Sequence, residues 1–91
     1  MSSRYIKIIV TKGCSACDIQ RTNVRKAIES LKNSEITVDV IDVANMTKKE
    51  TRQLNLQDFP TTLFYRDGGN TFKVVGTYPI PVIVRYIQLY L

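Results

Sequence analysis

The chain has 91 residues and a net charge of +5, and apolar residues make up 44% of it. This length suits a single compact domain over residues 1–91, and the composition excludes a disordered chain. Its apolar runs are too short for a membrane helix, which needs roughly 18 residues. The Lys and Arg residues are scattered without an aromatic-interleaved stripe, so we expect neither nucleic acid nor a membrane among the partners.

The N-terminus, MSSRYIKIIV, leads directly into a strand-like segment without the apolar region or cleavage site of a signal peptide. We therefore expect a cytoplasmic protein. Thiols stay reduced there, and a lone cysteine pair is more often catalytic or metal-binding than structural. The chain has no histidine, so cysteine must carry any nucleophilic chemistry without the commonest general base beside it.

The first half of the chain predicts a strand, a helix and a second strand. RYIKIIV, residues 4–10, is apolar and β-branched on both faces, which is typical of a strand inside a sheet. A helix is predicted from about Ser15 to Lys32. Its apolar residues form one stripe, made of Cys17, Val24, Ala27, Ile28 and Leu31. ITVDVIDV, residues 36–43, alternates as a strand does, and the helical connection implies that it pairs in parallel with the first strand.

The second half predicts a short helix, a hairpin and a last helix. Thr47 and Glu50 have the spacing of a capping box, which starts a helix running to about residue 54 or 56. Two strands, 61–66 and 71–75, flank a turn at Gly68-Gly69.

The last helix should begin near residues 79–81, because Pro79 and Pro81 are tolerated only in a first turn. Its apolar residues, which share one face, are Ile80, Ile83, Val84, Ile87, Tyr90 and Leu91. The resulting order, β-α-β-α-β-β-α, predicts an α/β fold in which a four-stranded mixed sheet carries helices on both faces.

KGCSACDIQ holds both cysteines of the chain, Cys14 and Cys17, at C-x-x-C spacing. This spacing has three readings: a redox couple, part of a metal site, or two core residues. A structural zinc site needs four ligands, so one chain with two cysteines and no histidine cannot build it unless carboxylates or a second copy contribute. Cys17 belongs to the apolar stripe, which fits a core residue.

Cys14 lies where the first strand ends and the helix begins. The first-turn N–H groups have no intrahelical acceptors there, so a thiolate at Cys14 is stabilised and its pKa is lowered. Lys12 adds a cation nearby, and Gly13 leaves room for an incoming disulfide. In the redox reading, Cys14 attacks as the exposed nucleophile and Cys17 then attacks Cys14 from its buried position.

With TKGCSAC, DFPTT and VVGTYP in this order, the chain resembles the thioredoxin-like superfamily and is most similar to a small glutaredoxin. The resemblance implies that Cys14 is the nucleophile and Cys17 the resolving thiol. It also implies that Pro60 is a cis-proline and that the Phe59 backbone pairs with an extended substrate. Three further residues, Gly76, Thr77 and Lys12, would complete the groove, with Lys12 meeting a carboxylate of glutathione.

The chain departs from the glutaredoxin pattern at three places. Ser15-Ala16 stands between the cysteines where Pro-Tyr is common, and Asp58 brings a negative charge to the glutathione groove. The acidic residues that usually hold the amino group of glutathione are replaced by Pro79-Ile80. These departures weaken the case for glutathione more than the case for redox chemistry. Thioredoxin proper fits less well, because the chain has no Trp and Ile8 stands at the position of its buried Asp.

The sequence therefore predicts a dithiol–disulfide oxidoreductase that reduces protein or mixed disulfides, with ribonucleotide reductase among the candidate substrates. We expect a monomer without a bound cofactor or metal, reduced by glutathione. Three alternatives remain: a thioredoxin-like redoxin recycled by thioredoxin reductase, a non-catalytic binding module on the same fold, and a dimer bridged by a metal or cluster.

Overall fold

The computed structural model describes residues 3–32 and 35–91, and its elements follow the predicted order. They are β1 (Arg4–Val10), α1 (Ser15–Ser30), β2 (Thr37–Asp42), the 3-10 turn η1 (Val43–Asn45), α2 (Lys48–Gln53), β3 (Thr61–Arg66), β4 (Gly69–Val75) and α3 (Ile80–Tyr90). None of the helices in these two ranges is long and apolar enough to cross a membrane.

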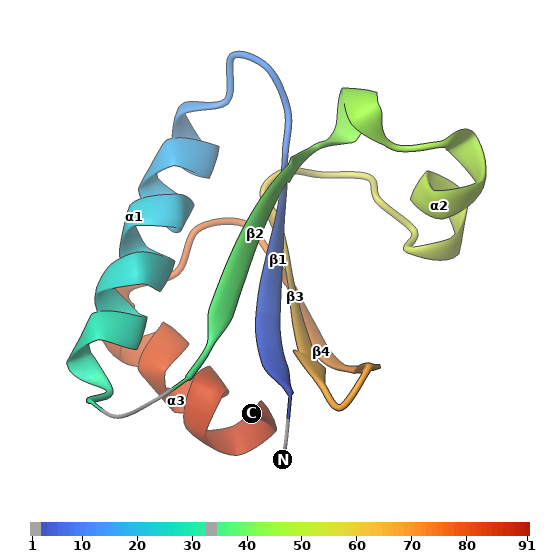
Figure 1. The fold of residues 1–91 in the computed structure, drawn as a ribbon. Helices are drawn as coiled ribbons and strands as arrows, with labels where there is room; N and C mark the ends of the chain where they lie inside the picture. Colours follow the sequence, from blue (N-terminus) through green and yellow to red (C-terminus); the bar gives the residue numbers. More distant parts are fainter. Residues whose placement is uncertain (1–2, 33–34) are drawn as a thin grey trace.

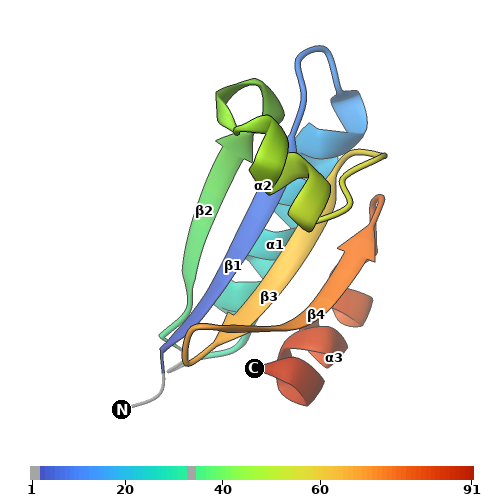
Figure 2. The same cartoon turned by 90° about the vertical axis from the view of Figure 1, so that its right-hand side faces the viewer.

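The four strands form one mixed sheet in the order β2-β1-β3-β4. β1 pairs in parallel with β2, and β3 is antiparallel to both β1 and β4. Helices α1 and α3 lie together on one face of the sheet, whereas α2 lies on the other face (Figures 1 and 2). This arrangement confirms the predicted mixed sheet with helices on both faces.

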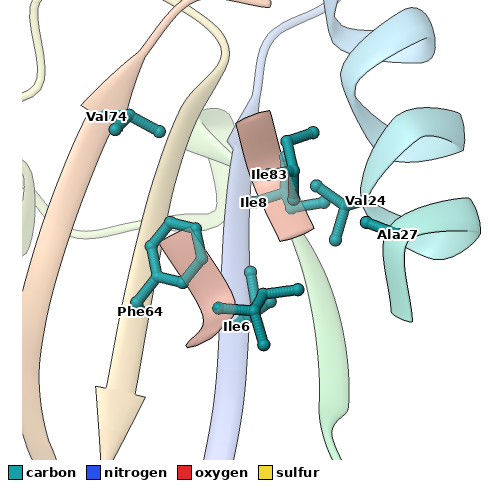
Figure 3. Close-up of a cluster of buried hydrophobic side chains, with 8 residues drawn as sticks. Ile6, Ile8, Val24, Ala27, Phe64, Val74 and Ile83 are labelled. Atoms are coloured by element: carbon teal, nitrogen blue, oxygen red, sulfur yellow. The ribbon is translucent and has the colours of Figure 1, made fainter. Parts of the chain in front are cut away.

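The main core lies between the sheet and the α1–α3 layer (Figure 3). Alternate residues of β1, Ile6 and Ile8, are fully buried against Val24 and Ala27 of α1. Ile9 points to the opposite face and is fully buried as well, so β1 is buried on both faces as its sequence predicted. This two-sided burial fixes the strand that leads into the cysteine pair.

α1 ends at Ser30, two residues earlier than predicted. The Ser30 hydroxyl donates to the Ala27 carbonyl (2.7 Å), which would accept the Leu31 N–H in a continued helix. The Leu31 N–H instead donates to the Ile28 carbonyl at 3.0 Å, and this tighter bond closes the helix.

β2 is one residue shorter than predicted at each end, Thr37–Asp42 instead of residues 36–43. At its C-terminal end, the Asp42 carboxylate accepts the Ala44 N–H (2.9 Å) and so starts η1 at Val43. A short-range hydrogen bond to the Asp42 side chain thus takes the place of strand pairing at Val43.

The hairpin turn lies at Asp67-Gly68, and the predicted turn at Gly68-Gly69 is wrong by one residue. Asp67 and Gly68 both have positive φ, 55° and 86°. A two-residue turn with two positive φ angles suits the twist of a hairpin, so pairing begins at once between Arg66 and Gly69. β4 therefore starts two residues before the predicted strand.

The predicted capping box at the start of α2 is present. The Glu50 N–H donates to the Thr47 hydroxyl at 3.1 Å, and the Thr47 N–H donates to the Glu50 carboxylate at 3.0 Å. Hydrogen bonding of the Glu50 carboxylate to Thr47, to its backbone first and to its side chain second, lowers the pKa of Glu50 below its ordinary value of 4.5.

We expect this box to make stability depend on pH in the acid range. Because the folded-state pKa of Glu50 is lowered, its stabilisation is present above the unfolded value of 4.5 and is lost as pH falls through the folded value. As pH falls through the acid range, the Tm of Glu50→Gln should decrease less than the Tm of the unsubstituted protein. Thermal unfolding followed by circular dichroism measures both. Glu29→Gln, which removes the same charge without a capping bond, serves as the control. Equal pH profiles for Glu50→Gln and the unsubstituted protein would contradict the expectation.

Candidate functional site

The two cysteines lie where the chain turns from β1 into α1. Gly13 has a φ of 75°, a conformation that L side chains rarely adopt, and this lets the chain reverse toward the helix. Cys14 is the N-cap of α1, and its Sγ accepts the Cys17 backbone N–H at 3.1 Å. Cys14 and Cys17 are joined by a disulfide, with 5.3 Å between their Cα atoms.

The two cysteines differ in burial. Cys17 is 2% exposed and packs on the inner stripe of α1, whereas Cys14 is only half-buried. An N-cap sulfur also lies at the positive end of the helix dipole, beside N–H groups that have no intrahelical acceptor. Cys14 is therefore the accessible cysteine of the pair, and Cys17 is the shielded one.

The loop before β3 forms one wall beside Cys14. The Phe59–Pro60 peptide is cis, as the resemblance implied, and the Pro60 side chain is fully buried. The Phe59 carbonyl oxygen lies 4.0 Å from Cys14 Sγ. A backbone segment that ends at β3 is thus held directly against the half-buried sulfur.

The segment between β4 and α3 forms a second wall. The Gly76 N–H donates to the Pro60 carbonyl at 2.8 Å, and the Gly76 φ of 99° favours glycine. The Thr77 hydroxyl donates to the Ala16 carbonyl at 3.1 Å. Four of the residues expected in the groove, Phe59, Pro60, Gly76 and Thr77, are therefore brought together around the start of α1.

Lys12 stands apart from this group. It lies in the exposed loop two residues before Cys14, and among the described residues its side chain makes no hydrogen bond or ion pair. A separate cavity of about 420 Å³ opens beside both cysteines, and its lining includes Gly13, Asp18 and Arg21. The site therefore has open space next to the disulfide as well as two backbone walls.

Sequence reasoning missed Gln20. Its side chain is fully buried, and its amide nitrogen donates to the Thr62 hydroxyl at 3.0 Å. Its amide oxygen accepts the Tyr78 N–H, also at 3.0 Å. A signal was present in the sequence, because Gln20 stands three residues after Cys17 and four before Val24, on the same helical stripe.

No metal cluster forms from these residues. Within residues 3–32 and 35–91, no three Cys, His, Asp or Glu side chains gather as a metal site.

No protein-family model matches the sequence, and no curated protein matches it. Solved structures do resemble the fold. Thioredoxin-2 of the malaria parasite, described as a component of its protein secretion machinery, gives a TM-score of 0.80 at 15% identity, over 97% of this chain and 84% of that one. Chloroplastic thioredoxin z gives 0.78 at 17% identity, over 97% and 78%. Thioredoxin of Malassezia sympodialis gives 0.75 at 16% identity, over 98% and 76%.

The TM-scores show that the fold is shared, and identities this low show the fold alone. The chain therefore has a thioredoxin-like fold with a disulfide-forming cysteine pair, as the resemblance implied.

The unequal burial predicts unequal reactivity in the reduced protein. We expect limiting iodoacetamide to label Cys14 at least about tenfold faster than Cys17, because reaction requires an accessible sulfur. Peptide mass spectrometry after a short reaction measures the two yields. The urea-unfolded protein, in which both cysteines are accessible, is the control and should label both at similar rates. Similar rates in the folded protein would contradict the assignment of Cys17 as the shielded sulfur.

Proposed function

We propose that the protein is a dithiol–disulfide oxidoreductase of glutaredoxin type, with Cys14 as the nucleophile and Cys17 as the resolving thiol. The observation that carries the proposal is the half-buried Cys14 sulfur at the N-terminus of α1, within disulfide reach of a shielded Cys17. A backbone N–H directed at this sulfur favours its thiolate, which is the reactive form of cysteine.

The reaction then proceeds in two exchanges. The Cys14 thiolate attacks one sulfur of the substrate disulfide, whose S–S bond breaks, and the departing thiolate takes a proton from solvent. Cys17 gives up its proton and attacks the Cys14 sulfur of the mixed disulfide. This step forms the Cys14–Cys17 disulfide and releases the second substrate thiol. Two electrons pass from the protein to the substrate.

The surroundings of Cys14 support a polypeptide or glutathione-mixed disulfide as substrate. The carbonyl of the half-buried residue Phe59 lies beside the sulfur, and an extended peptide segment can pair with a backbone of this kind through main-chain hydrogen bonds. Gly76 and Thr77 would contact the substrate from the second wall. A disulfide of ribonucleotide reductase is one substrate of this class.

We further propose glutathione as the reductant that restores the dithiol. Lys12, which is exposed in the loop before Cys14, would meet a glutathione carboxylate. Asp58 is exposed near this groove, and Tyr78-Pro79-Ile80 offers no carboxylate for the amino group of glutathione. These features favour a weak glutathione site, so thioredoxin reductase is the alternative electron source. As part of the same proposal, the protein acts as a monomer in the cytoplasm, where thiol reductants are abundant.

The two cysteine variants test the assigned roles. We expect Cys14→Ser to reduce insulin disulfides no faster than the reaction without protein, because it lacks the attacking sulfur. Cys17→Ser should still attack and should accumulate as a mixed disulfide, detectable by mass spectrometry. Insulin reduction that does not depend on Cys14 would contradict the proposal and would favour a binding module on this fold.

The same assay identifies the electron source. Turnover of the unsubstituted protein is measured once with glutathione as the reductant and once with thioredoxin reductase and NADPH, and the two rates are compared. Faster turnover with glutathione supports a glutaredoxin. In that case Lys12→Ala should lower the rate of turnover with glutathione, because the glutathione carboxylate loses its partner. A preference for the reductase would overturn the glutathione assignment and leave the dithiol mechanism in place.

A further inference from the structure

Gln20 connects three parts of the site from a fully buried position. It lies on α1, one turn after Cys17, and its amide bonds both Thr62 of β3 and the backbone of Tyr78. A buried amide requires partners for both its donor and its acceptor, and Gln20 has both. Gln20 is therefore a polar residue inside the otherwise apolar stripe of α1, and it links this helix to β3 and to Tyr78.

The Tyr78 contact holds the segment that forms the second wall of the groove. Tyr78 directly follows Thr77, and its carbonyl also accepts the Asn23 side-chain N–H at 2.9 Å. Both backbone groups of Tyr78 are therefore bonded to α1, through Gln20 and Asn23. The Thr77 hydroxyl adds a third bond, to Ala16 on the first turn of the same helix.

These bonds link the second wall to the helix that carries the cysteines. The Gly76 N–H reaches the Pro60 carbonyl, so the same segment also fixes the loop that contacts the Cys14 sulfur. The position of Thr77 and Tyr78 relative to the cysteines consequently depends on how the Gly76–Tyr78 segment sits on α1. Of the side chains on α1 that hold this segment, Gln20 is the fully buried one.

We propose that Gln20 is a positioning residue that holds the Gly76–Tyr78 segment in place beside the cysteine pair and so determines affinity for polypeptide disulfides. This inference rests on the proposed oxidoreductase function. In the part of the chain that the structure describes, Gln20 forms no hydrogen bond with either sulfur, and the bond from the Cys17 N–H to the Cys14 sulfur does not involve it.

Removal of the amide leaves the half-buried Tyr78 N–H without its acceptor. Such a group moves toward water when its partner is lost, and the Gly76–Tyr78 segment moves with it. A polypeptide that must contact both walls then binds less well. A small disulfide that meets only the Cys14 sulfur does not depend on the second wall.

Gln20→Met is the test variant, because methionine has a similar length and cannot form either bond. We expect KM for an insulin-derived peptide disulfide to rise about tenfold, the effect of losing one well-made hydrogen bond, with kcat changed by less than about twofold. The rate with a small aromatic disulfide should stay within about twofold of that of the unsubstituted protein. Asn23→Ala, at a less buried position on the same segment, should raise KM in the same direction.

Thr62→Val is the matched control. It removes the β3 partner of Gln20 and leaves the Tyr78 bond in place, so Tm should fall while KM for the peptide stays within about twofold. Unchanged KM in Gln20→Met would overturn the proposal. An equal rise of KM in Gln20→Met and Thr62→Val would overturn it as well, because KM would then follow stability alone. Absence of Cys14-dependent reduction in the unsubstituted protein is a different result, which would overturn the proposed function itself.

Discussion

The proposed chemistry depends on the hydrogen bond from the Cys17 backbone N–H to the Cys14 sulfur. The same four residues, Cys14 to Cys17, place one sulfur at the N-cap and the other one turn later on the buried stripe. Helix geometry alone thus provides an accessible sulfur in a field that favours its anion and a shielded sulfur within reach of it. No histidine or buried carboxylate is needed to produce this difference.

The rest of the fold keeps that helix tip in place. β1 is buried on both faces, so the point at which the chain leaves the sheet at Val10 is fixed. Val24 and Ala27 pack α1 onto the sheet (Figure 3), and Gly13 allows the reversal between the two elements. The Phe59–Pro60 loop and the Gly76–Tyr78 segment then approach the tip from two other elements. The site is therefore assembled from segments distant in the sequence, which surround the cysteine pair at the start of α1.

The local features of this structure could be predicted from the sequence. The capping box of α2, the strand at residues 4–10 and the placement of both cysteines depend on neighbouring residues and on hydrophobic period. Gln20 could not be assigned, because its partner Tyr78 lies 58 residues away and only the fold brings them together. The hairpin turn shifted by one residue because Asp67 adopts a positive φ, which the Gly68-Gly69 pair did not suggest. The cis form of Pro60 followed from the family resemblance, since residue preferences alone favour trans.

The most direct test of the account is the pKa of the Cys14 thiol, measured by thiolate ultraviolet absorbance in the Cys17→Ser variant. This variant keeps the backbone N–H at residue 17 and leaves Cys14 as the single titrating thiol. The account predicts a midpoint clearly below the ordinary cysteine value of about 8.5, returning to that value when the variant is unfolded in urea. A folded-state midpoint at or above about 8.5 would contradict the claim that the helix N-terminus activates Cys14.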